Sequence, residues 1–245
     1  MAAITVAMIT LNEQAAVGKV IADIQAATMG LDVEILVVDS SKDRTPEIAA
    51  AAGARVVRQF PPQGYGRAMA RALSEGRGEV VITLDCDDTY PPDRIPEMAR
   101  MVLAGPYDLV NASRLENKPS SMPLPNYLAN WLFAFVTWVL LGVKTTDVHS
   151  GMRAYRRSML DKVTFDPSGP ALPVDLMLKP VLTGYRLAEI FIPYRDRIGE
   201  TTLRRWASTI WTFKRILRLV PMRWQSPEPP VAPVAPVAVV PVPRP

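Results

Sequence analysis

Residues 79–92 read EVVITLDCDDTYPP, an apolar run that ends in an acidic cluster and a proline-containing turn. The run has the length and the β-branched content of a buried strand. In an open α/β sheet, ligands bind beyond the carboxyl ends of the strands. Because side chains alternate along an extended chain, Asp85 and Asp87 are expected to point to one side and Cys86 to the other. The stretch therefore predicts a strand that presents two carboxylates to a ligand.

The rest of the chain alternates similar apolar runs with helix-compatible stretches, which is typical of a sheet built through βαβ crossovers. Most of the runs are apolar on both faces, as buried parallel strands are. Strands are predicted at 4–9, 33–39, 54–58, 79–85, 107–113, 153–156 and 186–192, and helices at about 14–28, 45–52, 66–76, 92–103 and 174–183. We expect an α/β fold with a mostly parallel central sheet flanked by helices.

Length and charge narrow the class of protein. The chain has 245 residues, enough for one substantial core, and its single cysteine excludes an internal disulfide framework and agrees with a cytoplasmic location. Six basic residues and no acid lie between Leu203 and Trp224, and the remaining 22 basic and 24 acidic residues give a net charge of −2. Nothing in the body of the chain therefore predicts a nucleic-acid partner.

Two convergent carboxylates suit a hard divalent cation, Mg²⁺ or Mn²⁺, which keeps open positions for phosphate oxygens. Such a cation would neutralise the charge that appears on a departing diphosphate. Asp85 and Asp87 are the expected metal ligands, whereas Cys86 is expected to be a small packing residue. The alternative for the acidic cluster is a solvated turn or a helix cap.

Seven motifs, taken in order, resemble the glycosyltransferase family 2 pattern on a GT-A fold. They are TLNE at 10–13, VDSSKDRT at 38–45, GYGR at 64–67, DCDDTYPP at 85–92, ASR at 112–114, DVHSGMR at 147–153 and EIFIPYR at 189–195, with Arg197 and Gly199 beyond the last. The resemblance covers roughly residues 4–218 and lies nearest to dolichyl- or polyprenyl-phosphate mannose and glucose synthases. It implies a GT-A domain over residues 1–225.

The resemblance implies an inverting, metal-dependent hexosyltransferase. The donor would be a UDP- or GDP-sugar and the acceptor a polyprenyl or dolichyl phosphate at the membrane surface. One alternative is a family 2 enzyme that acts on a hydroxyl of a glycan, a glycolipid or a small molecule. The other is a non-catalytic adaptor at the membrane surface.

The same resemblance assigns the donor site. Leu11, Glu13 and Asp39 would hold the nucleotide, Asp85 would help to position it, and Asp87 would be the principal metal ligand. Where the family commonly has two acids and a glycine after the second strand, this chain has one acid and a serine, which leaves the base open. The alternatives are a helix N-terminal acid for Glu13 and an Asx turn for Asp39.

The acceptor site is assigned to Arg114, Ser150, Arg153 and Arg204. A guanidinium group matches phosphate in a bidentate way that lysine cannot. Arg114 is also a candidate catalytic residue, because it could contact either the acceptor phosphate or the donor diphosphate. A surface ion pair with Glu116 is the alternative for Arg114.

Two further elements of the reaction are assigned. Arg197 belongs to a segment that resembles the mobile loop over the donor, and would bring positive charge to the leaving diphosphate. A hydroxyl acceptor needs a general base, for which Asp175 is the candidate, whereas an ionised lipid phosphate needs none. Asp175 as a helix N-terminal acid is the alternative, and His149, the only histidine, is expected to be a hydrogen-bonded structural residue.

Two segments bear on membranes. Residues 203–219 have the pattern of a basic amphipathic helix in an anionic lipid interface, with a core-packed helix as the alternative. Residues 128–143 are nearly all apolar, but their helix would reach only about 24 Å, so a buried or interfacial helix is expected. We expect peripheral attachment to the cytoplasmic face through 203–219, and a disordered proline-rich tail at 226–245.

Overall fold

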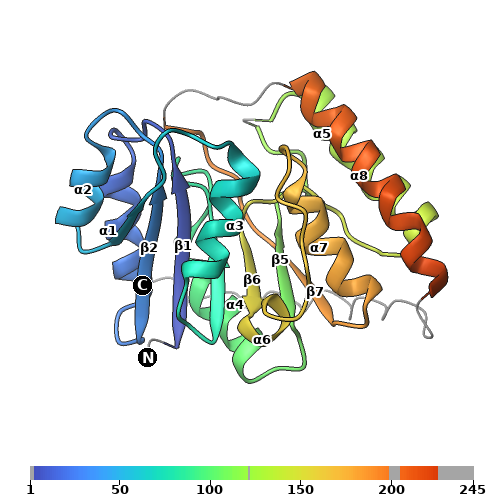
Figure 1. Ribbon diagram of the computed structural model, residues 1–245, viewed down its shortest axis with the longest axis horizontal. Helices are drawn as coiled ribbons and strands as arrows, with labels where there is room; N and C mark the ends of the chain where they lie inside the picture. The colour runs from blue at the N-terminus through green and yellow to red at the C-terminus, as the bar shows by residue number, and fades with distance from the viewer. Residues whose placement is uncertain (1–2, 121, 199–204, 226–245) are drawn as a thin grey trace.

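The computed structural model describes residues 3–120, 122–198 and 205–225 of the chain (Figure 1). A seven-stranded sheet forms its centre, with the strand order β3-β2-β1-β4-β6-β5-β7. The strands are β1 (Ile4–Thr10), β2 (Val33–Asp39), β3 (Arg55–Arg58), β4 (Val80–Thr83), β5 (Leu109–Ser113), β6 (Arg153–Arg156) and β7 (Leu187–Phe191). Neighbouring strands are parallel except where β6 pairs with β4 and β5. The prediction of a mostly parallel central sheet is confirmed.

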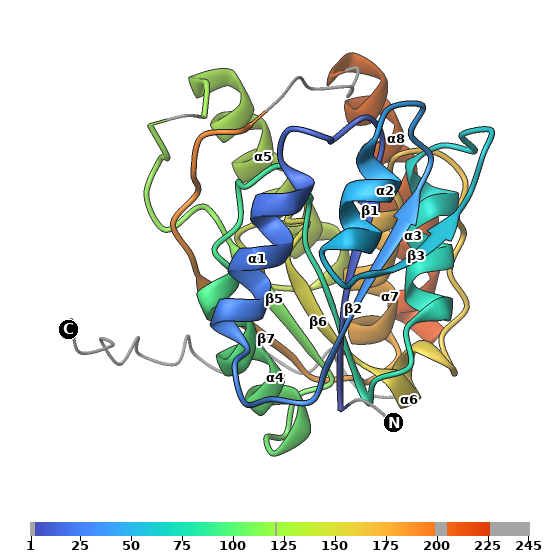
Figure 2. The ribbon, with the colours of Figure 1, turned by 90° about the vertical axis from the view of Figure 1, so that its left-hand side faces the viewer.

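Helices cover both faces of the sheet (Figure 2). One face carries α1 (Val17–Ala27), α2 (Thr45–Ala51) and α4 (Ile95–Leu103), and the other carries α3 (Tyr65–Glu75) and α7 (Leu172–Leu182). The short helices are η1 (Pro92–Arg94) and α6 (Arg157–Leu160), and two long helices, α5 (Leu124–Leu141) and α8 (Arg205–Gln225), lie side by side at one edge of the molecule (Figure 1). The two predicted layers of helices are therefore present.

The alternation of β1 explains why both layers are needed. Ile4, Val6 and Met8 pack under α1 and α4. Ala7 lies between Val6 and Met8 in the strand, so its side chain points to the opposite face and packs under α3 and α7. All four side chains are 3% exposed or less. A strand with apolar residues on both faces requires a helix layer on each side, because either face left open would expose its apolar surface to water.

The strand that carries the acidic cluster ends earlier than the sequence indicated. β4 stops at Thr83, and the chain turns through Asp88, whose φ of 64° is left-handed. Strand alternation therefore does not fix the side-chain directions of Asp85, Cys86 and Asp87, and the direction of Cys86 relative to the acids stays a prediction. Cys86 is nevertheless 3% exposed and belongs to the core, as its packing role requires.

The apolar segment at 128–143 forms most of α5. Four α5 residues, Phe133, Ala134, Thr137 and Leu141, are buried and the opposite side is exposed, so of the two expected forms, a buried or an interfacial helix, the buried one is excluded. Within the described part of the chain, α5 is the helix whose length and composition would allow it to cross a membrane.

The basic segment is helical over the residues that the structure describes. α8 runs from Arg205 to Gln225, and its inward side buries Ile216 and Leu219, while Lys214 is exposed. The structure therefore agrees with the alternative, a core-packed helix with a solvated basic edge, while contact with a lipid surface stays a prediction. Residues 203–204 and the proposed tail at 226–245 lie outside the described residues.

The core predicts a matched pair of stability changes. Leu36 of β2 is fully buried, whereas Leu31, in the turn before β2, is 45% exposed. We expect Leu36→Ala to lower the free energy of unfolding by about 2–5 kcal/mol, because it leaves a cavity. Leu31→Ala should change it by less than about 1 kcal/mol. Urea denaturation of both variants checks this, and equal losses would contradict the burial pattern.

Candidate active site

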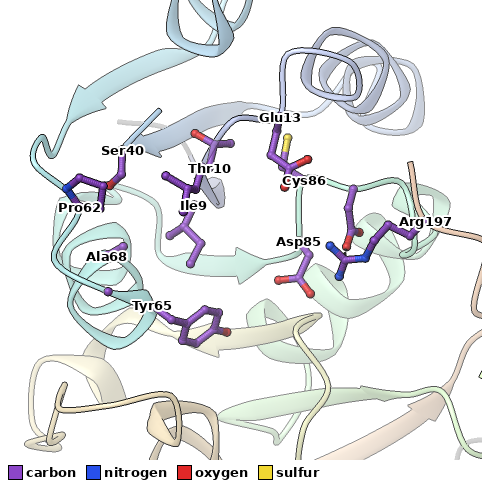
Figure 3. A pocket seen from close by; sticks show the side chains of 13 residues that line it. Ile9, Thr10, Glu13, Ser40, Pro62, Tyr65, Ala68, Asp85, Cys86 and Arg197 are labelled. Atoms are coloured by element: carbon purple, nitrogen blue, oxygen red, sulfur yellow. Dashed lines mark ion pairs between the residues drawn. The ribbon is translucent and has the colours of Figure 1, made fainter. Parts of the chain in front are cut away.

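A cavity of about 350 Å³ lies beyond the carboxyl ends of β1, β2 and β4 (Figure 3). β1 lies between β2 and β4, so the later strands lie on both sides of β1. The carboxyl end of β1 is therefore a topological switch point, where open α/β sheets form a crevice that binds ligands. The residues that line the cavity are Ile9, Thr10, Leu11, Glu13, Ser40, Pro62, Gly64, Tyr65, Ala68, Asp85, Cys86, Asp87 and Arg197. The structure thus brings together five residues of the predicted donor site: Leu11, Glu13, Asp85, Asp87 and Arg197.

Backbone contacts hold the loop that carries Leu11 and Glu13. Asn12 has a left-handed φ of 61°, and its side-chain oxygen accepts a hydrogen bond from the backbone N–H of Lys42 at 2.9 Å. The backbone N–H of Glu13 donates to Thr45 Oγ1 at 2.9 Å. These hydrogen bonds connect the loops that follow β1 and β2. The Glu13 side chain faces the cavity (Figure 3).

Asp39 lies behind the cavity wall. Its side chain is fully buried, accepts hydrogen bonds from Thr10 Oγ1 at 2.7 Å and from the Ser41 hydroxyl and backbone N–H, and forms an ion pair with Arg58. Ser40, the next residue, lines the cavity instead. This corrects the expectation that the Asp39 carboxylate faces the nucleotide, because its oxygens are taken by neighbouring loops. The bond to the N–H two residues on is the Asx turn given as the alternative.

Asp85 and Asp87 lie on the cavity wall nearest to β6. Burial, followed by the negative charge of Asp87, raises the pKa of Asp85 to about 6. The Asp85 carboxylate fits against Gly151, where a Cβ atom would come within 2.8 Å of Oδ2. Asp87 is 1% exposed, and Thr89 donates to its Oδ1. Two acids are thus held close together with little freedom to separate.

The buried Oδ2 atom of Asp87 tests whether a cation fits. Arg197 Nη2 forms an ion pair with it at 2.6 Å, although the contact does not have hydrogen-bond geometry. A buried carboxylate needs a positive partner, and a divalent cation would take the place that Arg197 holds here. Oxygen donors of this kind suit Mg²⁺ or Mn²⁺. No cluster of three or more acids, histidines or cysteines with metal-site geometry occurs among the described residues, so the donor diphosphate and water would complete the shell.

Burial is also the main cause that raises the pKa of Glu13 to about 7, with the charge of Asp87 second. The same side of the cavity therefore holds three acids, of which Glu13 and Asp85 lose their protons at higher pH than exposed carboxylates do. An added positive charge would favour the ionised form of all three.

A second cavity, of about 270 Å³, meets the first at Tyr65, Asp85 and Arg197. It extends from there to α5 and α8. Its other lining residues are Arg114, Asn126, Ala129, Asn130, Phe133, His149, Gly151, Pro170, Pro173, Tyr194, Thr209 and Thr212. A group bound in either cavity would reach the other across Asp85 and Arg197.

Arg114 is the basic residue that faces this second cavity along with Arg197. Its Nε and Nη2 atoms donate to the two oxygens of buried Asp147 at 2.7 and 2.9 Å, and its guanidinium lies 5.2 Å from the ring centre of Tyr194. Although burial opposes it, the charge of Arg114 lowers the pKa of Asp147. Arg114 forms its ion pair with Asp147, so the alternative, a surface ion pair with Glu116, is wrong. Arg114 is therefore a fixed cation.

Ser150 and Arg153 do not line the second cavity. The Ser150 hydroxyl donates to the Ala112 carbonyl at 2.6 Å. Arg153 is 1% exposed, and its guanidinium donates to the Asn111 side chain at 2.9 Å and to the Val148 carbonyl at 2.8 Å. The expectation that they bind the acceptor is corrected, because their polar atoms hold the turn before β6. Arg204 lies outside the described residues.

Asp175 is not positioned as a base. It stands in the first turn of α7, fully buried, and forms ion pairs with Arg215 of α8 at 2.9 Å and with Lys179 at 3.4 Å. It lines neither cavity. This corrects its assignment to catalysis and agrees with the alternative, a structural acid at a helix N-terminus.

His149 has the structural role that the sequence predicted. Its Nε2 atom shares a hydrogen bond of 2.9 Å with the Thr212 hydroxyl, and its ring packs edge-on against Phe133. Burial lowers the pKa of His149 to about 4, so it is neutral near pH 7. His149 thereby connects α5 with α8 and also lines the second cavity.

Sequence reasoning missed several residues of the site. Tyr65, Tyr194 and Gly151 line the cavities, and Asp147 and Arg58 anchor charged groups next to them. Four of these five lay inside motifs that were quoted for the resemblance, which is the signal that could have found them. Arg58 lay in no motif.

The fold and the site define the class: a GT-A glycosyltransferase, with an acid-lined cavity at the switch point of an open sheet and a cationic cavity beside it. The chain belongs to glycosyl transferase family 2, whose sequence profile matches residues 5–164.

Two relatives and one solved structure illustrate the similarity. The chain is 41% identical to a dolichyl-phosphate hexose transferase of Haloferax volcanii, over 88% of this chain and 93% of the relative. It is 27% identical to a dolichol-phosphate mannosyltransferase of Pyrococcus furiosus, over 91% of this chain and 64% of that one. The glucosyl-3-phosphoglycerate synthase of Mycobacterium tuberculosis, solved with Mn²⁺, UDP and phosphoglyceric acid, superposes with a TM-score of 0.72 at 25% identity, over 93% and 80% of the two chains.

The raised pKa of Glu13 predicts how stability changes with pH in the metal-free protein. The unfolded chain releases the Glu13 proton near pH 4.5, but the folded chain keeps it to about pH 7. The folded state therefore binds more protons between these values, so stability falls as pH rises through this window. We expect Glu13→Gln to reduce that fall, measured by urea denaturation at pH 5 and pH 8. Identical pH dependence in the two proteins would contradict the assignment.

Proposed function

We propose that this protein is an inverting, metal-dependent enzyme that transfers a hexose from a UDP- or GDP-sugar to a polyprenyl or dolichyl phosphate at the membrane surface. The observation that carries the proposal is the meeting of the two cavities at Asp85 and Arg197. One cavity has the acids for a metal and a diphosphate, and the other has a fixed arginine for a phosphate. The similarity to a dolichyl-phosphate hexose transferase supports the acceptor class.

The donor would occupy the first cavity. Leu11 and Glu13 would contact its nucleoside, and Asp85 and Asp87 would hold Mg²⁺ or Mn²⁺ against its diphosphate. When bound, the cation supplies positive charge to the departing diphosphate. The Mn²⁺ and UDP in the solved relative support this arrangement. Arg197, beside Asp87, would add a second positive charge to the same group.

The acceptor would enter the second cavity with its phosphate toward Arg114. Asp147 and Tyr194 hold the guanidinium in place before the phosphate binds. The Arg114 side chain therefore loses little conformational entropy on binding. Arg114 takes part in the reaction by orienting the attacking oxygen toward the anomeric carbon, opposite the diphosphate. Attack from that side inverts the configuration through an oxocarbenium-like state.

The lining of the second cavity favours a phosphate acceptor over a hydroxyl. A hydroxyl must lose a proton to a base, whereas a phosphate monoester is already ionised near pH 7. Among the described residues that line this cavity, Asp85 is the single carboxylate, and it faces the metal site. His149 is a poor base because its pKa is about 4, and Asp175 is held in ion pairs outside the cavity.

Peripheral attachment to the cytoplasmic face of the membrane, through the basic segment at 203–219, completes the proposal. Lys214 and Arg218 lie on the exposed side of α8. Each basic group near an anionic surface contributes about 1 kcal/mol. Such contacts would hold the enzyme where its lipid acceptor is dissolved.

A donor and acceptor screen tests the proposal as a whole. Purified protein is incubated with UDP- and GDP-sugars and Mn²⁺ or Mg²⁺, and nucleotide release is followed with a short-chain polyprenyl phosphate, with 3-phosphoglycerate or with neither. We expect release that depends on the lipid phosphate. Release that responds to 3-phosphoglycerate alone would favour a hydroxyl acceptor, and no release with any donor would refute the enzyme assignment.

Asp87 should be essential to turnover. We expect Asp87→Asn to lower kcat/KM by more than about 100-fold, because loss of a residue that merely supports a metal ligand already costs 10- to 100-fold. Asp23→Asn is the matched control, since Asp23 is an exposed partner of Lys19 on α1. Full activity of the Asp87 variant would rule out its role as metal ligand.

Arg197 and the cation should compete for Asp87 while no donor is bound. The ion pair at 2.6 Å places the guanidinium on the oxygen that would bind the metal. We expect Arg197→Met to tighten Mn²⁺ binding about fivefold in calorimetry without nucleotide, since a partly exposed ion pair is worth about 1 kcal/mol.

Arg195→Met is the control for that measurement, because Arg195 lies 3.9 Å from Asp88 and makes no ion pair with Asp87. Weaker Mn²⁺ binding by the Arg197 variant would show that Arg197 supports the metal site rather than occupying it.

A further inference from the structure

Three residues, Tyr65, Asp85 and Arg197, line both cavities of the site. Asp85 fits against Gly151, and Arg197 forms an ion pair with Asp87. Tyr65 belongs to neither contact, although it lies at the same junction. A group that passes from one cavity to the other has to cross the space between these three side chains, so Tyr65 lies beside its path.

The backbone fixes Tyr65 at the start of α3. Gly64 precedes it with a left-handed φ of 90°, a conformation that glycine adopts without strain. Gly66 follows it, and a Cβ atom at that position would overlap the carbonyl oxygens of Pro167 and Gly169. Because α3 lies this close to a neighbouring backbone segment, its first turn has little room to shift.

The Tyr65 side chain has an apolar and a polar end. It is partly buried and packs against the core cluster under α3 and α7. Figure 3 shows its hydroxyl end directed toward the side of the cavity that carries Asp85. Within residues 3–120, 122–198 and 205–225, no group forms a hydrogen bond with this hydroxyl. The polar end is therefore available to a ligand.

The Tyr65 hydroxyl keeps its proton near pH 7. Burial, followed by the negative charge of Asp85, raises the pKa of Tyr65 well above that of an exposed tyrosine. A protonated phenol both donates and accepts hydrogen bonds, whereas an ionised carboxylate only accepts and a guanidinium only donates. Tyr65 is thus the neutral member of the junction, between Asp85 and Arg197.

The position of the junction indicates which part of a substrate Tyr65 meets. In the proposed function, the donor diphosphate lies against Asp87 and the acceptor phosphate lies against Arg114. The hexose has to lie between them, because the attacking oxygen must reach its anomeric carbon. A sugar hydroxyl donates and accepts hydrogen bonds, and the Tyr65 hydroxyl matches it in both respects.

We propose that Tyr65 is a specificity-determining residue, whose hydroxyl forms a hydrogen bond with one hydroxyl of the donor hexose. The contact rests on the proposed function for the identity of the donor. It assigns a residue that recognises the sugar rather than the nucleotide or the acceptor. A hexose without that hydroxyl leaves Tyr65 unpaired, and a site built to bind a hydroxyl discriminates against such an analogue.

Calorimetry with Mn²⁺ and without acceptor tests the contact. UDP, UDP-glucose, GDP and GDP-mannose are titrated into the wild type and into Tyr65→Phe, which keeps the ring and removes the hydroxyl. For the nucleotide that binds, the affinity for its sugar conjugate should fall about 3- to 10-fold, as expected for one neutral hydrogen bond. The affinity for the free nucleotide should stay unchanged. Equal losses for the nucleotide and its conjugate would place Tyr65 at the diphosphate and overturn the proposal, as would no loss for either.

Tyr185→Phe is the matched control. Tyr185 is also a partly buried tyrosine that packs against the cluster under α3 and α7, but it lines neither the first nor the second cavity. This variant should bind all four ligands as the wild type does. If it reproduced the loss seen with Tyr65→Phe, the effect would come from packing in the core and the proposal would fail. Urea denaturation of both variants checks that they are equally stable.

Sugar nucleotides that each lack one hydroxyl of the hexose identify the group that Tyr65 contacts. One of these analogues should bind the wild type about 3- to 10-fold more weakly than the complete sugar nucleotide does. The same analogue should bind Tyr65→Phe as well as the complete sugar nucleotide does, because the partner of the missing hydroxyl is already absent. If Tyr65→Phe weakens the binding of every analogue by the same factor, no single hydroxyl is recognised and the proposal fails.

Turnover measurements separate this inference from the proposed function. With a short-chain polyprenyl phosphate as acceptor, Tyr65→Phe should raise the KM for the donor and leave the KM for the acceptor unchanged. A change in the acceptor KM alone would assign Tyr65 to the acceptor and overturn the inference. If the conjugate binds with the expected dependence on Tyr65 but its sugar reaches no lipid phosphate, the sugar contact stands and the proposed acceptor fails. If the wild type binds no sugar nucleotide, the proposed function itself fails.

Discussion

The crowding of two carboxylates at the end of β4 is the constraint on which the rest of the site depends. Gly151 leaves no room behind Asp85, and Asp87 is buried, so neither acid can turn away into water. Their mutual repulsion and the loss of hydration appear in the raised pKa of Asp85. Arg197 offsets part of this charge. In the proposed function, a divalent cation with a diphosphate would offset this charge more completely than Arg197 does.

The antiparallel strand β6 brings the second cavity next to this acidic site. Because β6 runs antiparallel to both of its neighbours, the turn that precedes it lies at the same edge of the sheet as the end of β4. That turn carries Asp147, His149 and Gly151. Asp147 fixes Arg114 at the end of β5, and Gly151 supports Asp85. One antiparallel strand in an otherwise parallel sheet thus places the fixed cation Arg114 at the same edge of the sheet as Asp85 and Asp87.

The outer helices connect the same turn to the surface of the molecule. His149 bonds to Thr212 of α8 and packs on Phe133 of α5, while the other sides of these helices are exposed and apolar. A soluble domain gains nothing from exposing so much apolar surface, since burial of that surface in a core would stabilise it. An exposed apolar side of this size marks a contact surface, and the inner side of the same helix pair lines the second cavity.

The sequence by itself determined a mostly parallel sheet flanked by helices and the two acids, Asp85 and Asp87, that follow its fourth strand, because apolar periodicity and the end of a strand are local properties. Tertiary structure alone decided which polar residues face the ligand. Asp39, Arg153 and Asp175 stand in motifs or at helix starts as functional residues do, yet their polar groups are held elsewhere. Arg58 and Arg215 form ion pairs with the two carboxylates, and Asn111 accepts a hydrogen bond from the Arg153 guanidinium. These partners lie 19, 40 and 42 positions away along the chain. A buried charge needs a partner, and only folding brings a partner so distant within hydrogen-bonding range.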